Sequence, residues 1–518
     1  MNTQRDSLDA ILRGLPRRFC LPDLAATEIN LDTLSSSAAL GVLIEQVRQT
    51  PAAGGASSRH QLPTNVLRSR FIDTLARLIG EVMDPHGGDP AFKAMVLRHR
   101  WPQVDEYARL SAHAKQDART VRALVNAIAH PAKQARMSSG WLRTAMGRLH
   151  EASAGLQASE GASLAAQPDT PIVASWQLLA DVVDALLNTL DVEQHPAFEE
   201  GLQALAQSDA LASLQRLQKL ASVPQVQQYL EFCHQQGPRQ GSVAAAKAGR
   251  QSRQRGERVE QRAYDAIQAL AQRLNDGFAD APRRSKVTAS GRLGATVSTE
   301  TGNARSGRWK VVTALHVPAD LSKGSRYAKT EWDVVLLRKS LRAGATTVWD
   351  IALLVEAKAS PDAATTDFPR LLRGLSVLNS ADPTHNYSFQ SAQGGVYISG
   401  LSLSGLPSNA HCLRDHVLYC CHVDNDNQRA NKIASLDPAN TMRLLSRPAC
   451  LEYAAQRLEG HCPDQSTLAP VWDELLHTPS LRPVLDHYAM ASRARALIVS
   501  ADDIHRYLNS EAPGKDNG

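Results

Sequence analysis

The chain has 518 residues, of which 43% are hydrophobic and 21% are charged, and its formal net charge is +5. One hydrophobic core rarely organises a chain of this length, so we expect several domains or domains with helical extensions. Charged residues interrupt the long apolar stretches, and the first residues lack the basic end and apolar run of an export signal. The sequence therefore predicts a cytoplasmic protein without a membrane span.

The N-terminal half has apolar residues at spacings of three and four, typical of amphipathic helices, as in FIDTLARLIGEVM and WQLLADVVDALLNTL. Tracts of small residues with Gly or Pro interrupt this pattern at 51–58, 152–171 and 235–257. We therefore predict two helical regions, 1–150 and 171–235. Neither offers a catalytic constellation, so we expect them to bind protein or to mediate oligomerisation.

Two phrases recur within this half of the chain. DPAFKAMVL at 89–97 is echoed by HPAFEEGLQAL at 195–205, and PQVDEYARL at 102–110 is echoed by PQVQQYLEF at 224–232. The offset changes from 106 to 122 residues, so a duplication would need an insertion in the second copy. Two interpretations stay open: an internal helical repeat, or unrelated helices that each begin with proline.

From Gly256 onward the pattern changes to a mixture of helix and strand. A helix is expected over GERVEQRAYDAIQALAQRLNDGF, followed by strand-like segments at 308–317, 331–338 and 347–358. TDFPRLLRGLSVL then predicts a helix with Pro369 in its first turn. Further strands are expected at 394–401 and 415–423. We predict an α/β central domain over 256–430 and a helical C-terminal region over 431–518.

Acidic residues stand in the second and third of these strands, whose apolar neighbours predict burial on both faces. Strand side chains alternate between faces, so Glu356 and Lys358 are expected to share a face with Leu354 and Ala352. A turn centred on the intervening loop would set Asp333 opposite Leu354, one diagonal step from Glu356. A slip of one residue would move Asp333 to the other face. In the expected register the two carboxylates are close enough to hold one cation.

Two carboxylates this close together favour binding of a divalent cation. In an apolar setting the two groups repel each other, and burial raises their pKa values. A hard divalent cation removes this cost, and oxygen ligands with room for water suit Mg²⁺, for which Mn²⁺ can substitute. The ammonium group of Lys358 can orient or deprotonate a water molecule, or balance charge on a phosphate. Together these groups predict phosphodiester hydrolysis.

The arrangement resembles the PD-(D/E)xK phosphodiesterase superfamily, which includes restriction endonucleases. The similarity lies in an Asp on the second strand, Glu-x-Lys on the third, and the order helix, three strands, helix, strand, over about residues 256–425. It implies an αβββαβ restriction-endonuclease-like core. It also implies that Asp333 and Glu356 bind the metal with the carbonyl oxygen of Ala357. Lys358 would then act on the water or on the scissile phosphate.

Members of the superfamily often add an acidic residue from the first helix. Glu260 is the best match here, with Glu257 one turn earlier as a substitute. The chain departs from the family pattern in one place, because Asp333 follows Trp332 rather than proline. The triplet SPD at 360–362 does not fit the pattern, since it follows the lysine instead of preceding the acidic pair.

The positive charge of the chain is unevenly distributed. Ten basic and two acidic residues lie between Ala281 and Thr330, a local net charge of +8. Such a run is either a solvated face or a phosphate-binding surface, and its place beside the candidate metal site favours phosphate. Two arginines at positions i and i+3 of the following helix either reach a phosphate backbone or are ordinary surface residues. The residues expected to bind nucleic acid are Arg283, Arg284, Lys286, Arg308, Lys329, Arg370 and Arg373.

Seven cysteines without a framework-like spacing predict a reduced protein. Cys and His crowd together in HCLRDHVLYCCH, residues 411–422. Cys420 and Cys421 are adjacent on a predicted strand and so point to opposite faces, which favours ordinary strand cysteines over a zinc site.

The sequence thus predicts a Mg²⁺-dependent nuclease, with DNA as the expected substrate. Two alternatives stay open: a non-enzymatic nucleic-acid-binding or scaffold protein with a degenerate nuclease fold, and a nuclease that cleaves RNA. The acidic hairpin also has a purely structural interpretation. In that interpretation one face of the hairpin is exposed, and Asp333 and Glu356 simply meet solvent.

Overall fold

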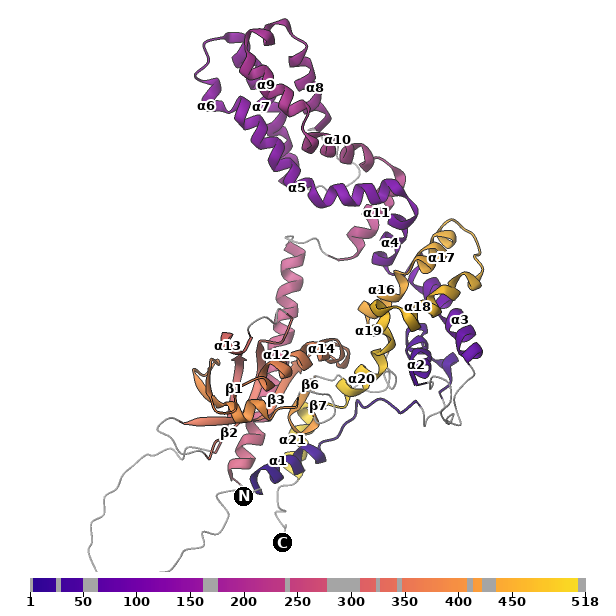
Figure 1. Ribbon diagram of the computed structural model, residues 1–518, viewed down its shortest axis with the longest axis vertical. Coiled ribbons are helices and arrows are strands. Elements are labelled where there is room, and N and C mark those ends of the chain that lie inside the picture. The colour runs from indigo at the N-terminus through magenta and orange to yellow at the C-terminus, as the bar shows by residue number, and fades with distance from the viewer. Residues whose placement is uncertain are drawn as a thin grey trace, which may run out of the picture. The chain divides into compact units, whose positions relative to one another are not determined.

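The chain divides into two units, shown in the computed structural model of Figure 1. Unit 1 consists of Met1–Thr74, Ala246–Thr441 and Glu474–Gly518, and unit 2 of Leu75–Ala245 and Met442–Asp473. The structure describes residues 3–24, 29–49, 64–161, 176–237, 243–276, 308–322, 327–341, 347–407, 413–421 and 435–510. The expected regions 1–150 and 431–518 therefore each contribute to both units.

Unit 2 is built from helices, as the apolar spacing predicts. In chain order its helices are α4 (Pro90–Arg100), α5 (Pro102–Ala129), α6 (Pro131–Gln134), α7 (Gly140–Gly161), α8 (Trp176–Leu187), α9 (Pro196–Ala206), α10 (Asp209–Ala221), α11 (Pro224–Gln235) and α17 (Pro448–Leu458). Apolar side chains on their inner faces form a common core, with Val121, Leu149, Val183 and Leu214 among its buried members. The expected amphipathic helices of the N-terminal half are confirmed.

The echoed phrases form four helices that each begin with proline: α4, α5, α9 and α11. Proline suits the first helical position, because an N–H there would have no acceptor within the helix. The second pair of phrases differs in extent, since α5 has 28 residues and α11 has 12. The unequal lengths favour independent helices with the same start over a duplicated pair.

The described residues of unit 1 contain a mixed sheet of seven strands. They are β1 (Trp309–His316), β2 (Glu331–Lys339), β3 (Val348–Lys358), β4 (Asn386–Phe389), β5 (Val396–Ser399), β6 (Val417–Cys421) and β7 (Ile498–Ser500). β1, β2 and β3 form an antiparallel meander, and β6 pairs parallel with both β3 and β7. β5 pairs parallel with the beginning of β3 and antiparallel with β4. The C-terminal end of β3 therefore lies between β2 and β6.

Helices cover both faces of this sheet (Figure 1). On one face lie α1 (Thr3–Gly14), α12 (Val243–Asp276) and α21 (Ala501–Ser510), which share a core with Val334 and Val355. On the other lie α14 (Pro361–Asn379) and α20 (His487–Arg495), which share a core with Val335 and Leu354. Burial on both faces accounts for the continuous apolar runs of β2 and β3.

The remaining α-helices of unit 1 are α2 (Ser36–Gln49), α13 (Ala319–Ser322), α15 (Gly400–Ser404) and α19 (Arg482–Leu485). Among the described helices, four cross a boundary between the units along the chain: α12, which begins in unit 2, and α3 (Thr64–Val82), α16 (Pro438–Leu445) and α18 (Ala469–His477). None of the described helices combines the length and apolar character that crossing a bilayer requires.

Two expected helix boundaries are wrong. α14 begins at Pro361, where the Ser360 hydroxyl accepts a hydrogen bond from the Ala363 N–H over 3.2 Å, so Pro369 lies inside the helix rather than in its first turn. The tract 235–257 is helical from Val243 onward as the first part of α12. Ala, Arg, Lys and Gln in that tract are good helix formers, and they outweigh its small-residue composition.

The C-terminal helical pattern is broken by a strand that the sequence did not predict. Ile498, Val499 and Ser500 form β7, which adds to the sheet beside β6. These three residues are fully or almost fully buried, whereas the α21 helix that follows is amphipathic. Pairing with a distant strand therefore overrides the local helical pattern at this point.

The register of the β2–β3 hairpin differs by two residues from the expected one. Val335, rather than Asp333, lies opposite Leu354. An even shift keeps every side chain on its face, so Asp333 stays on the side that was expected. One step beyond the last ladder pair, Asp333 comes beside Glu356 directly instead of diagonally.

A β-bulge interrupts the same hairpin. Leu336 pairs with Leu353, but the next residue, Leu337, pairs with Ile351 and leaves Ala352 as the extra residue. Ala352 and Leu353 consequently both contribute to the core on the α12 side. Ala352 therefore lies on the face opposite to the one that strict alternation predicts.

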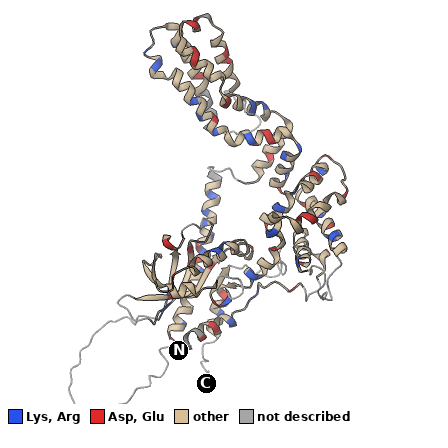
Figure 2. Ribbon diagram, in the orientation of Figure 1, with Lys and Arg blue, Asp and Glu red and all other residues tan. Residues whose placement is uncertain are grey.

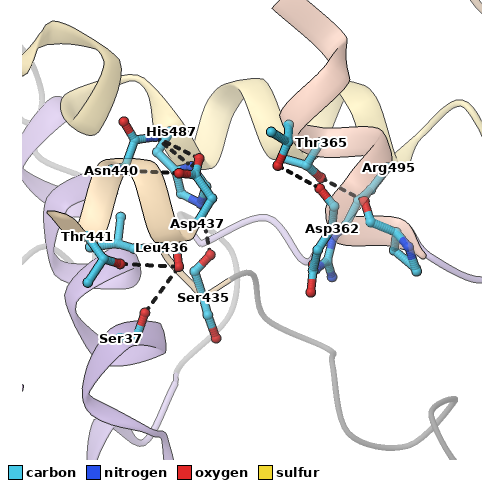
Figure 3. Close-up of polar contacts among 12 residues, drawn as sticks. Ser37, Asp362, Thr365, Ser435, Leu436, Asp437, Asn440, Thr441, His487 and Arg495 are labelled. Carbon is cyan, nitrogen blue, oxygen red and sulfur yellow. Dashed lines mark hydrogen bonds and ion pairs between the residues drawn. The ribbon is translucent and has the colours of Figure 1, made fainter. Parts of the chain in front are cut away.

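Polar contacts tie the segment that leads into α16 to helix α20 (Figure 3). The Nε2 atom of His487 lies 2.9 Å from the carbonyl oxygen of Ser435. Its Nδ1 atom lies 3.3 Å from Asp437 Oδ2 and 3.3 Å from Asn440 Nδ2. Both ring nitrogens of this buried histidine thus have partners. These contacts hold residues 435–440 against α20.

Candidate active site

The hairpin brings Asp333, Glu356 and Lys358 together where β3 ends. The amide N–H of Ala357 donates to Asp333 Oδ2 over 2.8 Å, which holds that carboxylate against the neighbouring strand. Lys358 Nζ lies 3.1 Å from Glu356 Oε2 and 4.0 Å from Asp333 Oδ2. The three side chains that the sequence assigns to one site therefore converge.

Glu356 is fully buried, so its carboxyl group does not meet solvent as the exposed-face interpretation requires. Burial raises the pKa of Glu356 to about 7, and the Asp333 carboxylate adds to this shift while two lysines oppose it. Oε2 contacts the ammonium groups of Lys329 and Lys358, but Oε1 has no hydrogen-bond partner among the described residues. Leaving a buried carboxylate oxygen without a partner is costly, and a cation at Oε1 would remove that cost.

Lys358 belongs to a chain of polar contacts that reaches α14 and β6. Its Nζ lies 3.6 Å from Asp367 Oδ2, which also accepts a hydrogen bond from the Tyr419 hydroxyl over 3.3 Å. Burial alone lowers the pKa of Lys358, but its three carboxylate neighbours together raise it above the ordinary value. Lys358 therefore keeps its proton at neutral pH. It acts as a positive charge and a hydrogen-bond donor rather than as a base.

A cleft with a volume of 470 Å³ lies beside Asp333, where α12 faces β1 and β2. Its acidic lining residues are Glu257, Glu260, Glu331 and Asp333. Burial foremost, and then the charges of Asp333 and Glu331, raise the pKa of Glu260. The acidic residue expected from the first helix thus faces the cleft, and its substitute Glu257 lines the same wall.

The backbone of β1 is strained at this cleft. Ala314 has a φ of 48°, in the left-handed region that residues with a Cβ rarely adopt. Its two neighbours pair with the residues on either side of Asp333, so Ala314 stands opposite Asp333 in the β1–β2 ladder. Strain of this kind often accompanies functional sites, where the surrounding fold compensates for its cost.

The donor set suits a hard divalent cation, because it offers the carboxylate oxygens of Asp333 and Glu356, one of them without a partner. The carbonyl oxygen of Ala357 is the third ligand that the resemblance implies. Within the described part of the chain, no group of three or more His, Cys, Asp or Glu side chains could hold a metal ion. A cation here would therefore rely on two carboxylates, a main-chain oxygen and water, with Glu260 facing the cleft.

The residues expected to bind nucleic acid differ in exposure, and some of them lie outside the described part of the chain. Three of them lie outside the described residues: Arg283, Arg284 and Lys286. Arg308, Arg370 and Arg373 are exposed, and Arg373 Nε donates to the carbonyl oxygen of Tyr327 over 3.0 Å. Lys329 is only 4% exposed and lies inside the carboxylate cluster. Its burial argues against a position on an exposed nucleic-acid-binding surface, and a contact with nucleic acid stays a prediction.

Lys329 and Asp367 belong to the site without having been predicted there. Lys329 Nζ lies 2.5 Å from Glu356 Oε2 and 3.7 Å from Asp333 Oδ1. Its position four residues before Asp333 is the one signal that could have suggested this, and it is weak, because a lysine in a basic run looks like a surface residue. Asp367 reaches Lys358 from α14, so it depends on how that helix packs on the sheet.

The two adjacent cysteines of β6 point to opposite faces of the sheet, as predicted. Burial raises the pKa of Cys420 to about 12 and raises the pKa of Cys421 as well. Both thiols thus keep their protons, whereas a zinc ligand must lose its proton. His411 and His422, at the ends of that phrase, lie outside the described residues. These observations favour ordinary core cysteines.

Comparison of the chain with protein-family models, with curated proteins and with solved structures finds no match. The fold of unit 1 and the geometry of its carboxylate cluster are therefore the observations from which a function has to be argued.

Proposed function

We propose that unit 1 is a Mg²⁺-dependent phosphodiesterase of the PD-(D/E)xK type that hydrolyses DNA. The observation that carries the proposal is the convergence of Asp333, Glu356 and Lys358 at the end of β3, beside an acidic cleft. The buried Oε1 of Glu356 adds to it, because a cation at this atom would satisfy a group that has no partner among the described residues.

The order of elements supports the same proposal. α12 precedes β1, β2 and β3, α14 follows, and β6 then pairs parallel with β3. This order supports the αβββαβ core that the resemblance implies, with β4 and β5 between β3 and β6 along the chain and β7 beyond β6. Asp333 on the second strand and Glu356 on the third occupy the positions that the resemblance assigns to them.

A bound magnesium ion would stabilise negative charge on the phosphate and activate a water molecule for in-line attack. Asp333 and Glu356 would hold the ion through their carboxylate oxygens, together with the Ala357 carbonyl. The hydrogen bond from the Ala357 N–H fixes Asp333 Oδ2, so the orientation of this carboxylate is set before any ligand binds.

Two further side chains have complementary roles in this proposal. Lys358 keeps its proton because its pKa is raised, so its ammonium group would balance the charge that develops on the phosphate. Asp367, which accepts a hydrogen bond from the Tyr419 hydroxyl, holds Lys358 in place. Glu260 has a raised pKa and faces the cleft, so it accepts a proton more readily than an ordinary glutamate. We assign the proton of the attacking water to Glu260.

Exposed positive charge supports an anionic polymer as the substrate. Between Ala246 and Gly256, the first turns of α12 carry exposed basic residues and no acidic residue (Figure 2). These basic residues are Lys247, Arg250, Arg253 and Arg255. Arg370 and Arg373 add exposed charge on α14. A phosphate backbone binds such surfaces by an attraction that weakens as salt is added.

The test is a cleavage assay with the purified full chain and Mg²⁺ on plasmid DNA, single-stranded DNA and RNA. Wild type is expected to cut DNA, and Asp333→Asn, Glu356→Gln and Lys358→Ala are expected to lose cutting. Asp350→Asn is the matched control, because Asp350 is a β3 carboxylate that pairs with Arg338 at 3.4 Å, outside the cluster.

Three results would redirect or reject the proposal. Cutting of RNA alone would favour the RNA-cleaving alternative. Equal loss of activity in Asp350→Asn and Glu356→Gln would remove the link to the cluster. A folded wild-type protein that binds DNA but cuts no substrate with Mg²⁺ or Mn²⁺ would contradict the nuclease proposal.

One observation favours a non-enzymatic alternative. Lys329 and Lys358 already lie close to both carboxylates, so the cluster is a buried ion network with internal charge compensation. Under this alternative unit 1 is a nucleic-acid-binding or scaffold protein. Wild type and Lys358→Ala would then bind DNA equally well, and neither would cut it.

A further inference from the structure

Lys329 brings an ammonium group between the two carboxylates of the proposed metal site. Its Nζ lies 2.5 Å from Glu356 Oε2 and 3.7 Å from Asp333 Oδ1. The side chain is 5% exposed, compared with 19% for Lys358. Lys329 is therefore the more deeply buried of the two lysines, although no strand pattern in the sequence identifies it as a site residue.

The surroundings of Lys329 accommodate a buried cation. Its Nζ lies 5.7 Å from the ring centroid of the fully buried Trp332, and the face of an aromatic ring attracts positive charge. Gly374 on α14 leaves the space that the lysine needs. A Cβ at that position would come within 2.8 Å of Lys329 Cβ and 3.3 Å of the Trp332 ring. The ammonium group is thus held between an aromatic ring and two carboxylates.

The carboxylates need this charge when no metal is bound. Two adjacent negative groups in a buried setting repel each other, and a positive charge close to both offsets the repulsion. Lys358 is shared with a third carboxylate, Asp367, at 3.6 Å. Lys329 therefore supplies the compensation that a divalent cation would supply in the loaded site.

A divalent cation would compete with this ammonium group for the position between the two carboxylates. An ion held by Asp333 and Glu356 would have to share the space at their carboxylates with the Lys329 ammonium group, which already contacts both, and like charges repel strongly in a poorly solvated setting. Glu356 Oε1 is the oxygen at which an entering ion would find no competing partner among the described residues.

We propose that Lys329 is an internal counter-ion that Mg²⁺ displaces. In the metal-free protein it is a positioning residue that holds Asp333 and Glu356 together, and metal binding moves its ammonium group out of the cluster. This inference rests on the proposed function, because it assigns metal binding to the same carboxylates. Its consequence is that Lys329 weakens the affinity of the site for the metal.

Calorimetric titration of the full chain with Mg²⁺ alone tests this consequence, at a pH well above the pKa of about 7 that burial gives Glu356. Lys329→Met removes the charge and keeps an unbranched side chain against the Trp332 ring. It is expected to bind Mg²⁺ about tenfold more tightly than wild type, or tighter still, because a repulsive charge is gone. Lys329→Arg keeps the charge and is expected to stay within about threefold of wild type.

A second measurement uses the wild-type protein and does not depend on how the variants fold. Reductive methylation of lysine amines, read by peptide mass spectrometry, is expected to spare Lys329 without Mg²⁺ and to modify it at saturating Mg²⁺. Lys93 in unit 2 is the matched control. It is also buried, lies 5.5 Å from the Phe232 ring centroid, and donates to the carbonyl oxygen of Asp84. Its modification should not respond to Mg²⁺.

The outcomes separate this inference from the nuclease proposal. Tighter Mg²⁺ binding by Lys329→Met with no cleavage by any variant supports the counter-ion and contradicts the nuclease. Cleavage by wild type, with equal Mg²⁺ affinity in Lys329→Met and unchanged labelling of Lys329, contradicts the counter-ion and leaves the nuclease intact. Absence of Mg²⁺ binding by both wild type and Lys329→Met also overturns the counter-ion.

Discussion

The amide N–H of Ala357 on β3 donates to the carboxylate of Asp333 on β2, over 2.8 Å. The main-chain ladder between these strands ends at the pair Val334 and Val355, one step earlier. The Asp333 side chain thus continues the strand pairing where the backbone stops. The same contact sets the orientation of a candidate metal ligand, so the strand pairing and the geometry of the candidate site depend on one atom, Oδ2.

Substitutions at Asp333 should separate these two roles. Asp333→Asn keeps an oxygen that can accept from Ala357, whereas Asp333→Ala leaves a partly buried N–H without an acceptor. We expect Asp333→Ala to unfold with a free energy about 1–2 kcal/mol lower than that of Asp333→Asn. Both should lose Mg²⁺-dependent cleavage. Denaturant unfolding measures the difference, and equal stability of the two variants would show that the hydrogen bond contributes nothing to the fold.

Glu356 should make stability depend on pH. Burial raises its pKa to about 7 from the ordinary 4.5, so the folded protein retains a proton that the unfolded chain releases. The resulting stabilisation is fully present below about pH 4.5 and is lost as the pH rises through about 7. A shift of this size corresponds to a loss on the order of 3 kcal/mol.

Glu356→Gln has no proton to release, so the difference in unfolding free energy between wild type and Glu356→Gln should change across this window. Denaturant unfolding at several pH values without Mg²⁺ measures it, and Asp350→Asn controls for loss of a β3 carboxylate elsewhere. A wild-type curve parallel to that of Glu356→Gln from about pH 4.5 to 7 would mean that this carboxyl group titrates normally.

The sequence predicts the chemistry of the hairpin better than its geometry. An acidic residue in a buried strand is conspicuous, which is why Asp333, Glu356 and Lys358 could be assigned to one site. The register could not be derived, because it depends on the turn and on the bulge at Ala352. Local alternation carries no information about either feature. The expected face of Asp333 was nevertheless right, because the error in register was even.

Features that depend on distant parts of the chain were missed. Lys329 is buried because Gly374, on a later helix, leaves room for it. β7 is a strand because β6 offers it an edge, although its sequence lies within a helical pattern. In both cases the decisive partner is far away in sequence. Apolar periodicity sufficed for the helices of unit 2, where neighbouring turns set the pattern.

Gly374→Ala tests the packing around Lys329. The added Cβ would lie 2.8 Å from Lys329 Cβ and 3.3 Å from the main-chain oxygen of Lys329, closer than packing allows. We expect a loss of about 1–3 kcal/mol in unfolding free energy. Gly147→Ala on α7 is the control, because nothing lies within 4 Å of its Cβ position. That change should be neutral or stabilising by up to about 1 kcal/mol, since alanine favours helix.

The two glycines are compared by denaturant unfolding of each variant beside wild type. Because Gly374 and Gly147 belong to different units, a fluorescent label attached within unit 1 should report the first change and not the second. If Gly374→Ala has the same free energy of unfolding as wild type, then α14 shifts to accommodate the added Cβ. Lys329 would then be packed less tightly than the contacts indicate.

Arg370→Ala tests the contact of α14 with a phosphate backbone. Arg370 is exposed, and its neighbour Arg373 is already engaged with the carbonyl oxygen of Tyr327, so Arg370 is the sharper probe of the two. Loss of one phosphate contact should reduce the slope of log affinity against log salt by about 0.9 for duplex DNA. Arg143→Ala, which removes an exposed arginine from α7 of unit 2, is the matched control.

Binding is measured by fluorescence anisotropy over a range of salt concentrations, without Mg²⁺ so that no cutting interferes. A slope for Arg370→Ala equal to that for Arg143→Ala and wild type would place the DNA contact elsewhere on unit 1, with the exposed first turns of α12 as the next surface to test.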